Sequence, residues 1–181
     1  ETQAVGPTTS DWINLKDISQ HLIHAVIVAE DVHFLSHHGL DLGEIWSSLS
    51  LNLKEKRIVR GGSTITQQMV KLGFLSNERT ILRKVQEGLG ALLAELILEK
   101  DEILVWYLNL APFGGNVRGV RNAAQHYFNK PPDLLTLRES IYLAAVLPSP
   151  SPSGRRVSAK ELDQVMVRRF KFILTQLHAG G

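Results

Sequence analysis

The chain has 181 residues, of which 44% are hydrophobic, and these values are typical of an ordinary globular protein with one core. The net charge of +2 is too small to indicate a nucleic-acid partner, and the absence of cysteine excludes disulfides and thiolate metal sites. No run reaches the ~18 consecutive apolar residues of a membrane-spanning helix, and no signal peptide is recognisable. We therefore expect a soluble or peripheral chain, and its start at Glu1 is consistent with removal from a longer precursor.

Apolar residues recur mostly at every third or fourth position, which predicts a mainly α-helical protein without a confident strand. The first helix is expected over residues 17–30, with Asp17 as its N-cap and Glu30 at its C-terminal end. A carboxylate at a helix C-terminus faces unpaired carbonyl groups, which raise its pKa and suit it to accept a proton. The alternative is a solvated Glu30–Asp31 pair at a frayed end, and the dipeptide alone favours this alternative.

His37 follows shortly after this helix. It can be read as a second proton carrier, as a metal ligand or as a structural histidine bonded to a nearby carboxylate. The structural reading is favoured, because no second histidine stands at metal-ligand spacing.

Residues 40–53 are rich in leucine and are followed directly by the basic run 54–57. One interpretation is a core helix with a solvated charged end. The other is an amphipathic segment that lies in a membrane interface, with Trp46 and Leu49 toward the lipid and the cations at the headgroups. Spacing alone does not separate the two.

A helix is expected to begin at Ser63 or Thr64, after two glycines, because Thr64 and Gln67 have the spacing of a capping box. Hydroxyl groups, free amide N–H groups and the positive end of the helix dipole predict a phosphate-binding start. Gln67 and Lys71 are four residues apart and share a face, so Lys71 extends this site by one turn. The alternative is a well-capped helix with an exposed lysine.

A long helix is expected over residues 76–99, with Arg79, Arg83 and Glu87 in one row at four-residue spacing. This row can be a surface salt-bridge ladder, which spacing alone favours, or a site where two arginines bind an anionic leaving group beside a second carboxylate. The predicted core face of this helix consists of six apolar residues: Leu82, Val85, Leu89, Leu92, Leu93 and Leu96.

Three further helices complete the expected fold. One covers residues 103–108 and is opened by Lys100 or Asp101. The second begins at Thr136, which has capping-box spacing to Glu139, and is stopped by Pro148. The last follows Ser158, which has the same spacing to Glu161.

Taken together and in this order, these segments resemble glycosyltransferase family 51, the peptidoglycan glycosyltransferase domain of penicillin-binding proteins and monofunctional transglycosylases. The resemblance covers roughly residues 12–155 and implies one domain over 1–181, with a C-terminal helix over 156–181. The loop 111–115 is similar to that of penicillin-binding proteins of the 1C type. The matching blocks are 30–39 (E-D-x-x-F-x-x-H-x-G), 61–71 (G-G-S-T-I-T-Q-Q-x-x-K), 83–87 (R-K-x-x-E), 103–109 (I-L-x-x-Y-L-N) and 123–147.

The resemblance implies a mainly α, lysozyme-like fold with a large lobe and a smaller membrane-facing lobe that includes 40–58. It implies that a lipid-linked glycan donates its reducing end to the 4-hydroxyl of lipid II, forming a β-1,4 bond with inversion and releasing undecaprenyl pyrophosphate. The expected location is the periplasmic face of the bacterial inner membrane, with an N-terminal anchor outside this chain. Expected partners are lipid II, the lipid-linked glycan, the membrane surface and other cell-wall synthesis proteins, but no nucleic acid.

The resemblance also assigns roles by position. Glu30 is the base that deprotonates the acceptor hydroxyl, and Glu87 is the second essential carboxylate, which assists the leaving group or positions substrate. Trp46 and Leu49 contact the membrane. A divalent cation such as Mg²⁺ can neutralise the pyrophosphate, with ligands that the sequence does not fix, and no organic cofactor is expected. The remaining substrate-binding positions are Asp31, His37, Ser63, Gln67, Lys71, Arg79 and Arg83.

The sequence also departs from the family pattern. Gln86 stands at a position that is basic in some members, and Leu72 replaces a frequent Asn, which predicts weaker anion binding. The tail after Pro148 lacks the usual Tyr-Asn-Pro ending, so the resemblance does not assign substrate contacts there, for which Arg155 or Arg156 is the candidate. Two alternative functions stay open: a lysozyme-like glycan hydrolase with Glu30 as acid, and an inactive scaffold that binds wall precursors.

Overall fold

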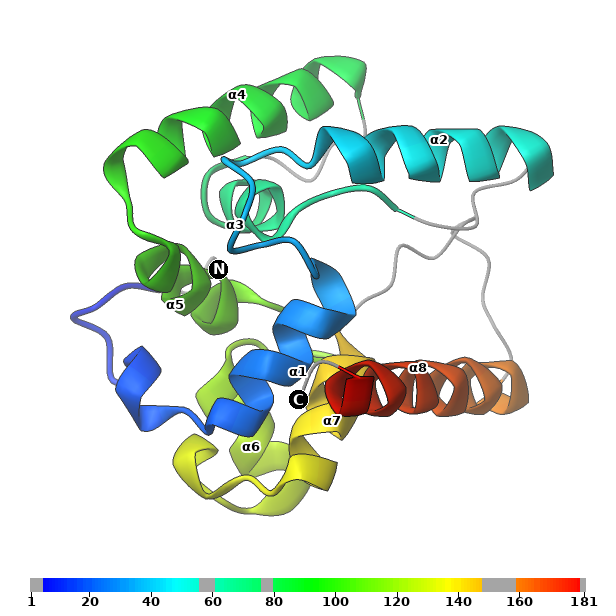
Figure 1. The fold of residues 1–181 in the computed structure, drawn as a ribbon. Coiled ribbons are helices and arrows are strands. Elements are labelled where there is room, and N and C mark those ends of the chain that lie inside the picture. Colours follow the sequence, from blue (N-terminus) through cyan, green and yellow to red (C-terminus); the bar gives the residue numbers. More distant parts are fainter. Residues whose placement is uncertain (1–4, 56–60, 76–79, 148–158, 180–181) are drawn as a thin grey trace.

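The structure is a computed structural model, and it describes residues 5–55, 61–75, 80–147 and 159–179. Within these ranges the chain forms α-helices and two short 3-10 helices but no strand, which confirms the predicted mainly α fold (Figure 1). In chain order the elements are η1 (Leu15–Asp17), α1 (Gln20–Glu30), α2 (Leu42–Glu55), α3 (Ile65–Phe74), α4 (Ile81–Ile97), α5 (Lys100–Leu110), α6 (Val120–Phe128), η2 (Pro132–Leu134), α7 (Leu137–Val146) and α8 (Ala159–Ala179).

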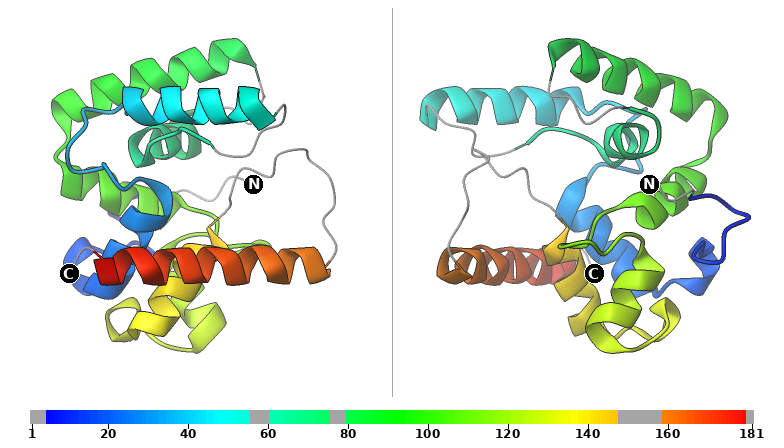
Figure 2. Two further views of the ribbon diagram at one scale, coloured as in Figure 1. Left: turned by 45° about the vertical axis from the view of Figure 1, so that its right-hand side comes forward. Right: turned by 180° about the vertical axis from the view of Figure 1, so that it is seen from behind.

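The helices are arranged in two layers, which all three ribbon views show (Figures 1 and 2). The upper lobe contains α2, α3 and α4, and the lower lobe contains α1, α6, α7 and α8. Helix α5 lies between them and packs against α3, while α1 packs against α7 and α8. The chain leaves the C-terminal end of α1 and rises into the upper lobe, so Glu30 lies where the two lobes meet.

Helix starts follow their capping residues. Thr64 and Thr136 each form the predicted capping box, with Gln67 and Glu139 respectively. The predicted start of the first helix at Asp17 is wrong, because residues 15–17 form a separate 3-10 turn and α1 begins after Ser19. Its predicted end at Glu30 is confirmed.

Two further boundaries differ from the prediction. Helix α5 begins at Lys100 and continues to Leu110, two residues beyond the predicted end, and Glu99 is its N-cap. Helix α6 was not predicted, because its N-cap is Gly119 with φ +78°, which has no capping side chain, and its buried residues are few and mostly small.

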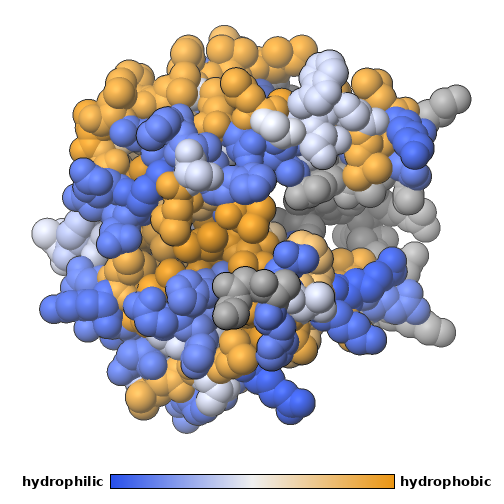
Figure 3. Space-filling view, viewed as in Figure 1, coloured by the Kyte–Doolittle hydropathy of each residue, from blue (hydrophilic) through white to orange (hydrophobic). Residues whose placement is uncertain are grey.

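The predicted core face of the long helix is wrong. All six of its apolar residues are exposed, and α4 instead buries Glu87, Ala91 and Ala94. The physical reason is close packing: a Cβ on Gly39, which has φ +88°, would lie 2.8 Å from the carbonyl oxygen of Ala91. Small residues therefore face the rest of the protein, and the leucines are left outside, where hydrophobic residues gather along the upper edge of the molecule (Figure 3).

Helix α2 is not a core helix. Ser48 is the one buried residue in its described length, whereas Leu42 and Trp46 are each 72% exposed. The interpretation of 40–53 as a core helix is therefore wrong. The exposure of α2 agrees with the alternative, an amphipathic helix at the surface.

Candidate active site

Glu30 is buried at the junction of the lobes, with its side chain only 8% exposed. One carboxylate oxygen, Oε2, accepts a hydrogen bond of 3.0 Å from Nε2 of Gln68 on α3. The other, Oε1, pairs with Nη2 of Arg169 on α8 at 2.7 Å. The interpretation of Glu30 and Asp31 as a solvated pair at a frayed end is therefore wrong.

The pKa of Glu30 is raised above the ordinary carboxyl value, chiefly because burial removes the carboxylate from water. The charge of Arg169 and the hydrogen bonds from Gln68 and Arg169 oppose this shift, and the charge of Asp31 adds to it. The direction agrees with the sequence prediction, and burial, which the sequence did not reveal, is the largest cause. A buried carboxylate with a raised pKa is suited to accept a proton near neutral pH.

Asp31 ties the end of α1 to the start of α3. Its Oδ2 atom accepts the backbone N–H of Ile65 at 2.9 Å and pairs with Nε2 of His37 at 2.9 Å. Both side chains are buried, so the structural reading of His37 as a carboxylate-bonded histidine fits the geometry. The two residues therefore hold the backbone beside Glu30, and direct substrate binding by either remains a prediction.

The start of α3 is already hydrogen-bonded to the protein. The N–H of Ile65 donates to Asp31, the N–H of Gln67 to the Thr64 hydroxyl, and the N–H of Thr64 to Oε1 of Gln67. The prediction of free amide groups for phosphate is wrong for these three donors, because the capping box and a carboxylate occupy them. An anion at this place depends on cationic side chains instead.

Glu87, the second carboxylate of the predicted site, is buried on α4, with its side chain 4% exposed. It pairs with Nη1 of Arg83 at 2.6 Å and with Nζ of Lys84 at 2.8 Å. Lys84 also donates to the hydroxyl of Ser63 at 2.7 Å, and it is half exposed. We call Arg83 and Lys84, which Glu87 holds, the cationic cluster. Lys84 places its positive charge at Ser63, beside the start of α3. Lys84 was not among the site residues predicted from the sequence.

The other predicted donor-site residues divide into three cases. Lys71 lies on α3, four residues after Gln67 and three after Gln68, and is partly exposed. Gln67 is buried, and its Oε1 atom accepts the N–H of Thr64 in the capping box. This oxygen is therefore not available to a ligand. Arg79, like Arg155 and Arg156, lies outside the described residues.

Helix α3 connects the two carboxylates. Gln68, in its second turn, bonds Glu30, and Ser63, just before its first turn, bonds the lysine that pairs with Glu87. The structure therefore brings together Glu30, Ser63 and Glu87 around one short helix. A buried carboxylate and a cationic cluster that both contact the short segment 63–68 form an arrangement suited to the displacement of an anionic leaving group.

Arg169 is, with Lys84, a functional candidate that sequence reasoning missed. It lies 139 residues after Glu30, on a helix that was predicted without any site residue. Nothing in its local sequence distinguishes it from Arg168, and only the packing of α8 against α1 and α7 reveals the contact.

A metal site held by protein side chains does not fit the described part of the chain. No group of three or more His, Asp or Glu residues there is placed to hold an ion. Both oxygens of Glu87 face cations, which further disfavours a metal ligand at that position.

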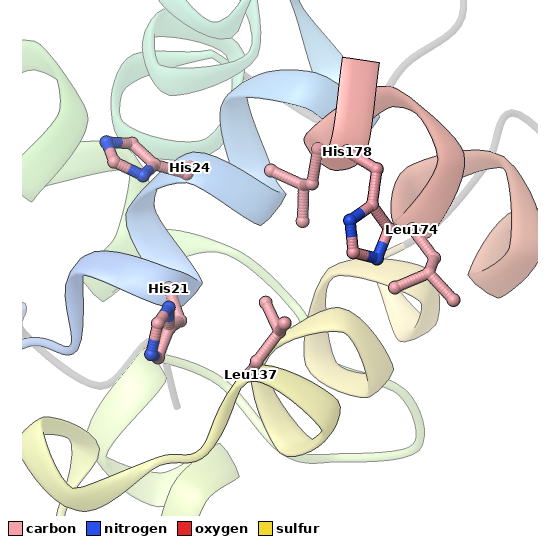
Figure 4. Close-up of a pocket in the computed structure, with 6 residues that line it drawn as sticks. His21, His24, Leu137, Leu174 and His178 are labelled. Atoms are coloured by element: carbon pink, nitrogen blue, oxygen red, sulfur yellow. The ribbon is translucent and has the colours of Figure 1, made fainter. Parts of the chain in front are cut away.

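A separate small cavity of about 190 Å³ lies between α1, α7 and α8 and is lined by three histidines among its residues. Figure 4 shows His21 and His24 on α1 and His178 near the end of α8, with Leu137 between them and Leu174 beside His178. His24 is six residues before Glu30, about 9 Å along the helix, so the cavity is distinct from the carboxylate junction.

Comparison with known proteins gives consistent matches. A sequence model described as "Transglycosylase" matches residues 2–178. Proteins named biosynthetic peptidoglycan transglycosylase from Yersinia pseudotuberculosis serotype O:1b and from Yersinia pestis (strain Pestoides F) are each 42% identical over 173 residues. These alignments cover 95% of this chain and 70% of each relative.

Proposed function

The chain belongs to the transglycosylase family, and on this basis we propose that it is a peptidoglycan glycosyltransferase that polymerises lipid II into glycan strands. The observation that carries the proposal is the buried Glu30, which bonds Gln68 near the start of α3, while Lys84 of the cationic cluster bonds Ser63 just before the same helix. The match over residues 2–178 also supports one glycosyltransferase domain over 1–181.

In the proposed reaction, Glu30 takes the proton of the acceptor 4-hydroxyl. The hydroxyl oxygen then forms a bond to the anomeric carbon of the donor, and the bond from that carbon to the diphosphate breaks. Attack from the face opposite the leaving group inverts the anomeric centre and gives a β-1,4 link. An ionised carboxylate has about four acceptor positions, so Glu30 can accept this proton while Gln68 and Arg169 remain bound.

The leaving diphosphate is expected to bind where cations converge. Arg83 and Lys84 are held by Glu87, and Lys71 is a partly exposed residue of α3, the helix that follows Ser63. Oriented cations stabilise the charge that develops as the diphosphate departs. A hydrolase, which releases a neutral sugar, needs no such cluster, and this favours the transferase over the hydrolase.

The donor site gives a binding prediction. Lys71→Ala is expected to weaken binding of a diphosphate-containing donor analogue by about tenfold, since a charge-assisted hydrogen bond contributes ~1.5 kcal/mol or more. Arg79→Ala, outside the described residues, is expected to act in the same direction. Titration calorimetry measures both, with Lys16→Ala as the control because Lys16 is an exposed lysine of η1. Equal affinity for the Lys71 variant and wild type would remove Lys71 from the donor site.

We also propose that the upper lobe lies against the outer surface of the inner membrane. Helix α4 and helix α2 expose large apolar side chains that no described part of the protein covers, and Lys54 and Lys84 lie on the same two helices. None of the described helices is long and apolar enough to cross a membrane. The exposed apolar residues, which we call the upper apolar surface, are Leu42, Trp46, Leu49 and Leu53 on α2 and Ile81, Leu82, Val85, Leu89, Leu92, Leu93, Leu96 and Ile97 on α4.

The membrane contact is open to a direct test. Replacing Leu89 and Leu93 together by Gln is expected to lower partition into vesicles of phosphatidylethanolamine and phosphatidylglycerol by at least about tenfold, because each leucine loses roughly 1 kcal/mol or more of burial in lipid. A sedimentation assay with these vesicles measures the partition. The matched control replaces Leu134 and Phe172 together by Gln, since their exposure is similar to that of Leu89 and Leu93 but they lie outside the upper lobe. Equal binding by the two double variants would place the membrane contact elsewhere.

The proposed activity is tested with lipid II in detergent. The purified chain is expected to form strands that a muramidase specific for β-1,4 bonds degrades. Strands that resist this enzyme would overturn the proposed stereochemistry, and absence of strands would overturn the activity.

A further inference from the structure

Arg169 and Glu30 form a buried ion pair between helices that are far apart in sequence. The distance from Nη2 to Oε1 is 2.7 Å, and the side chains are 18% and 8% exposed. The same nitrogen lies 3.5 Å from the carbonyl oxygen of Ala144 on α7. The guanidinium is therefore oriented by α7 as well as by the carboxylate.

The two contacts to Glu30 come from opposite sides of the junction. Gln68 reaches Oε2 from the upper lobe, and Arg169 reaches Oε1 from the lower lobe. Two donors on two oxygens fix the carboxylate plane, which a single donor cannot do. Placement of this kind matters because a misplacement of about 1 Å at a reacting group can reduce a rate by roughly 100-fold.

We propose that Arg169 is a positioning residue for Glu30, which clamps the carboxylate together with Gln68 so that its unused lone pairs face the acceptor hydroxyl. This inference rests on the proposed function of Glu30 as base. It adds α8 to the machinery of the site.

The electrostatics around Glu30 support the same role. The charged and titratable groups that face it are Arg169 from α8, Asp31 next to it in the chain and Tyr107 from α5. Burial and Asp31 raise the pKa of Glu30, and among these groups Arg169 supplies the opposing positive charge. Removal of the guanidinium therefore raises the pKa further and leaves a larger share of the base protonated near pH 7.

A purely structural tether is the alternative, and α8 has its own apolar anchor. Ile173 is 1% exposed, and Phe170, Leu174 and Leu177 are partly buried against the same core. Loss of one guanidinium therefore leaves most of the α8 contacts in place. This makes Arg169→Ala usable as a test variant.

The first measurement needs no activity. In protein labelled with ¹³C at the glutamate carboxyl carbons, the Glu30 resonance is the one that disappears in Glu30→Gln. Its titration midpoint is expected to rise by about one unit or more in Arg169→Ala, because loss of an adjacent opposite charge shifts a carboxyl by about one to three units. Arg169→Lys, which keeps a shorter cation, is expected to lie between the two. An unchanged midpoint in Arg169→Ala would overturn the proposal, whether or not the protein polymerises lipid II.

The second measurement is the polymerisation rate as a function of pH. Arg169→Ala is expected to lose about 10- to 100-fold near pH 7 and to shift the acidic limb to higher pH. Free guanidinium is expected to restore part of the rate in Arg169→Ala but none in Glu30→Gln. The control is Arg168→Ala, since Arg168 is an exposed neighbour whose Nε bonds the carbonyl of Gln164. A rate loss with an unshifted limb and no rescue would assign Arg169 to a structural tether instead.

Discussion

Glu30→Gln is expected to reduce lipid II polymerisation by about 10³-fold, the typical contribution of a general base. The amide has nearly the same shape as the carboxylate and can still accept a hydrogen bond from Gln68 or Arg169. It cannot, however, take the proton of the acceptor hydroxyl. The rate of strand formation from labelled lipid II, with enzyme in excess, measures the loss.

The fold of this variant has to be checked in the same preparation. Glu55→Gln is the matched control, because Glu55 is an exposed glutamate at the end of α2. It is expected to polymerise lipid II at the wild-type rate. Glu30→Gln that retains the helical circular dichroism of wild type and yet polymerises at the wild-type rate would remove Glu30 from the role of base.

Glu87→Gln is expected to have the second largest effect, with a loss of about 100-fold in kcat/KM for the lipid-linked donor. The carboxylate holds Arg83 and Lys84 in place, and an amide carries no charge to hold either of them. The two cations then separate by repulsion, and the diphosphate loses part of its oriented site. Donor titration at fixed acceptor concentration measures the change.

Stability changes need to be separated from this loss. Breaking a partly buried pair is expected to lower the free energy of unfolding by about 2 kcal/mol, which urea denaturation measures. Glu95→Gln is the matched control, since Glu95 is buried on the same helix and holds Lys100 and Thr66. It is expected to lose similar stability but to stay within about threefold of the wild-type kcat/KM. Equal activity losses in both variants would indicate a general effect on folding.

The helical framework is predictable because its signals are local. Thr64 with Gln67 and Thr136 with Glu139 form capping boxes within four residues, and both appear as predicted. The same capping box shows the limit of such reasoning. Its hydrogen bonds occupy the N–H groups of Thr64 and Gln67, and Asp31 accepts the N–H of Ile65, so these three groups are not available to phosphate.

The burial of α4 could not be predicted from its periodicity. A leucine stripe normally indicates the core face, but here Gly39 approaches the backbone at Ala91 so closely that small residues must face inward. The stripe instead marks an exposed surface, as expected where a protein contacts lipid or a partner.

Contacts between distant helices account for the other omissions. Lys84 stands in a block whose arginine and glutamate were recognised, yet its bond to Ser63 depends on how α4 crosses the start of α3. Arg169 reaches Glu30 through the packing of α8 on α1 and α7. Sequence spacing predicts neighbours on one helix, whereas these pairs join different helices.

The proposed transferase and the alternative hydrolase would both use a buried carboxylate, so the two functions differ mainly in the leaving group. A diphosphate requires nearby cations, and Arg83 with Lys84 supplies them beside Ser63. An inactive scaffold would need neither the raised pKa of Glu30 nor its two fixed donors.

The most direct measurement presents the purified chain with lipid II in one reaction and with finished peptidoglycan sacculi in another. Wild type is expected to form glycan strands with one undecaprenyl pyrophosphate released per disaccharide added, to release no muropeptides from sacculi, and to lose strand formation on Glu30→Gln. Muropeptide release from sacculi without strand formation from lipid II would contradict the account and identify a hydrolase.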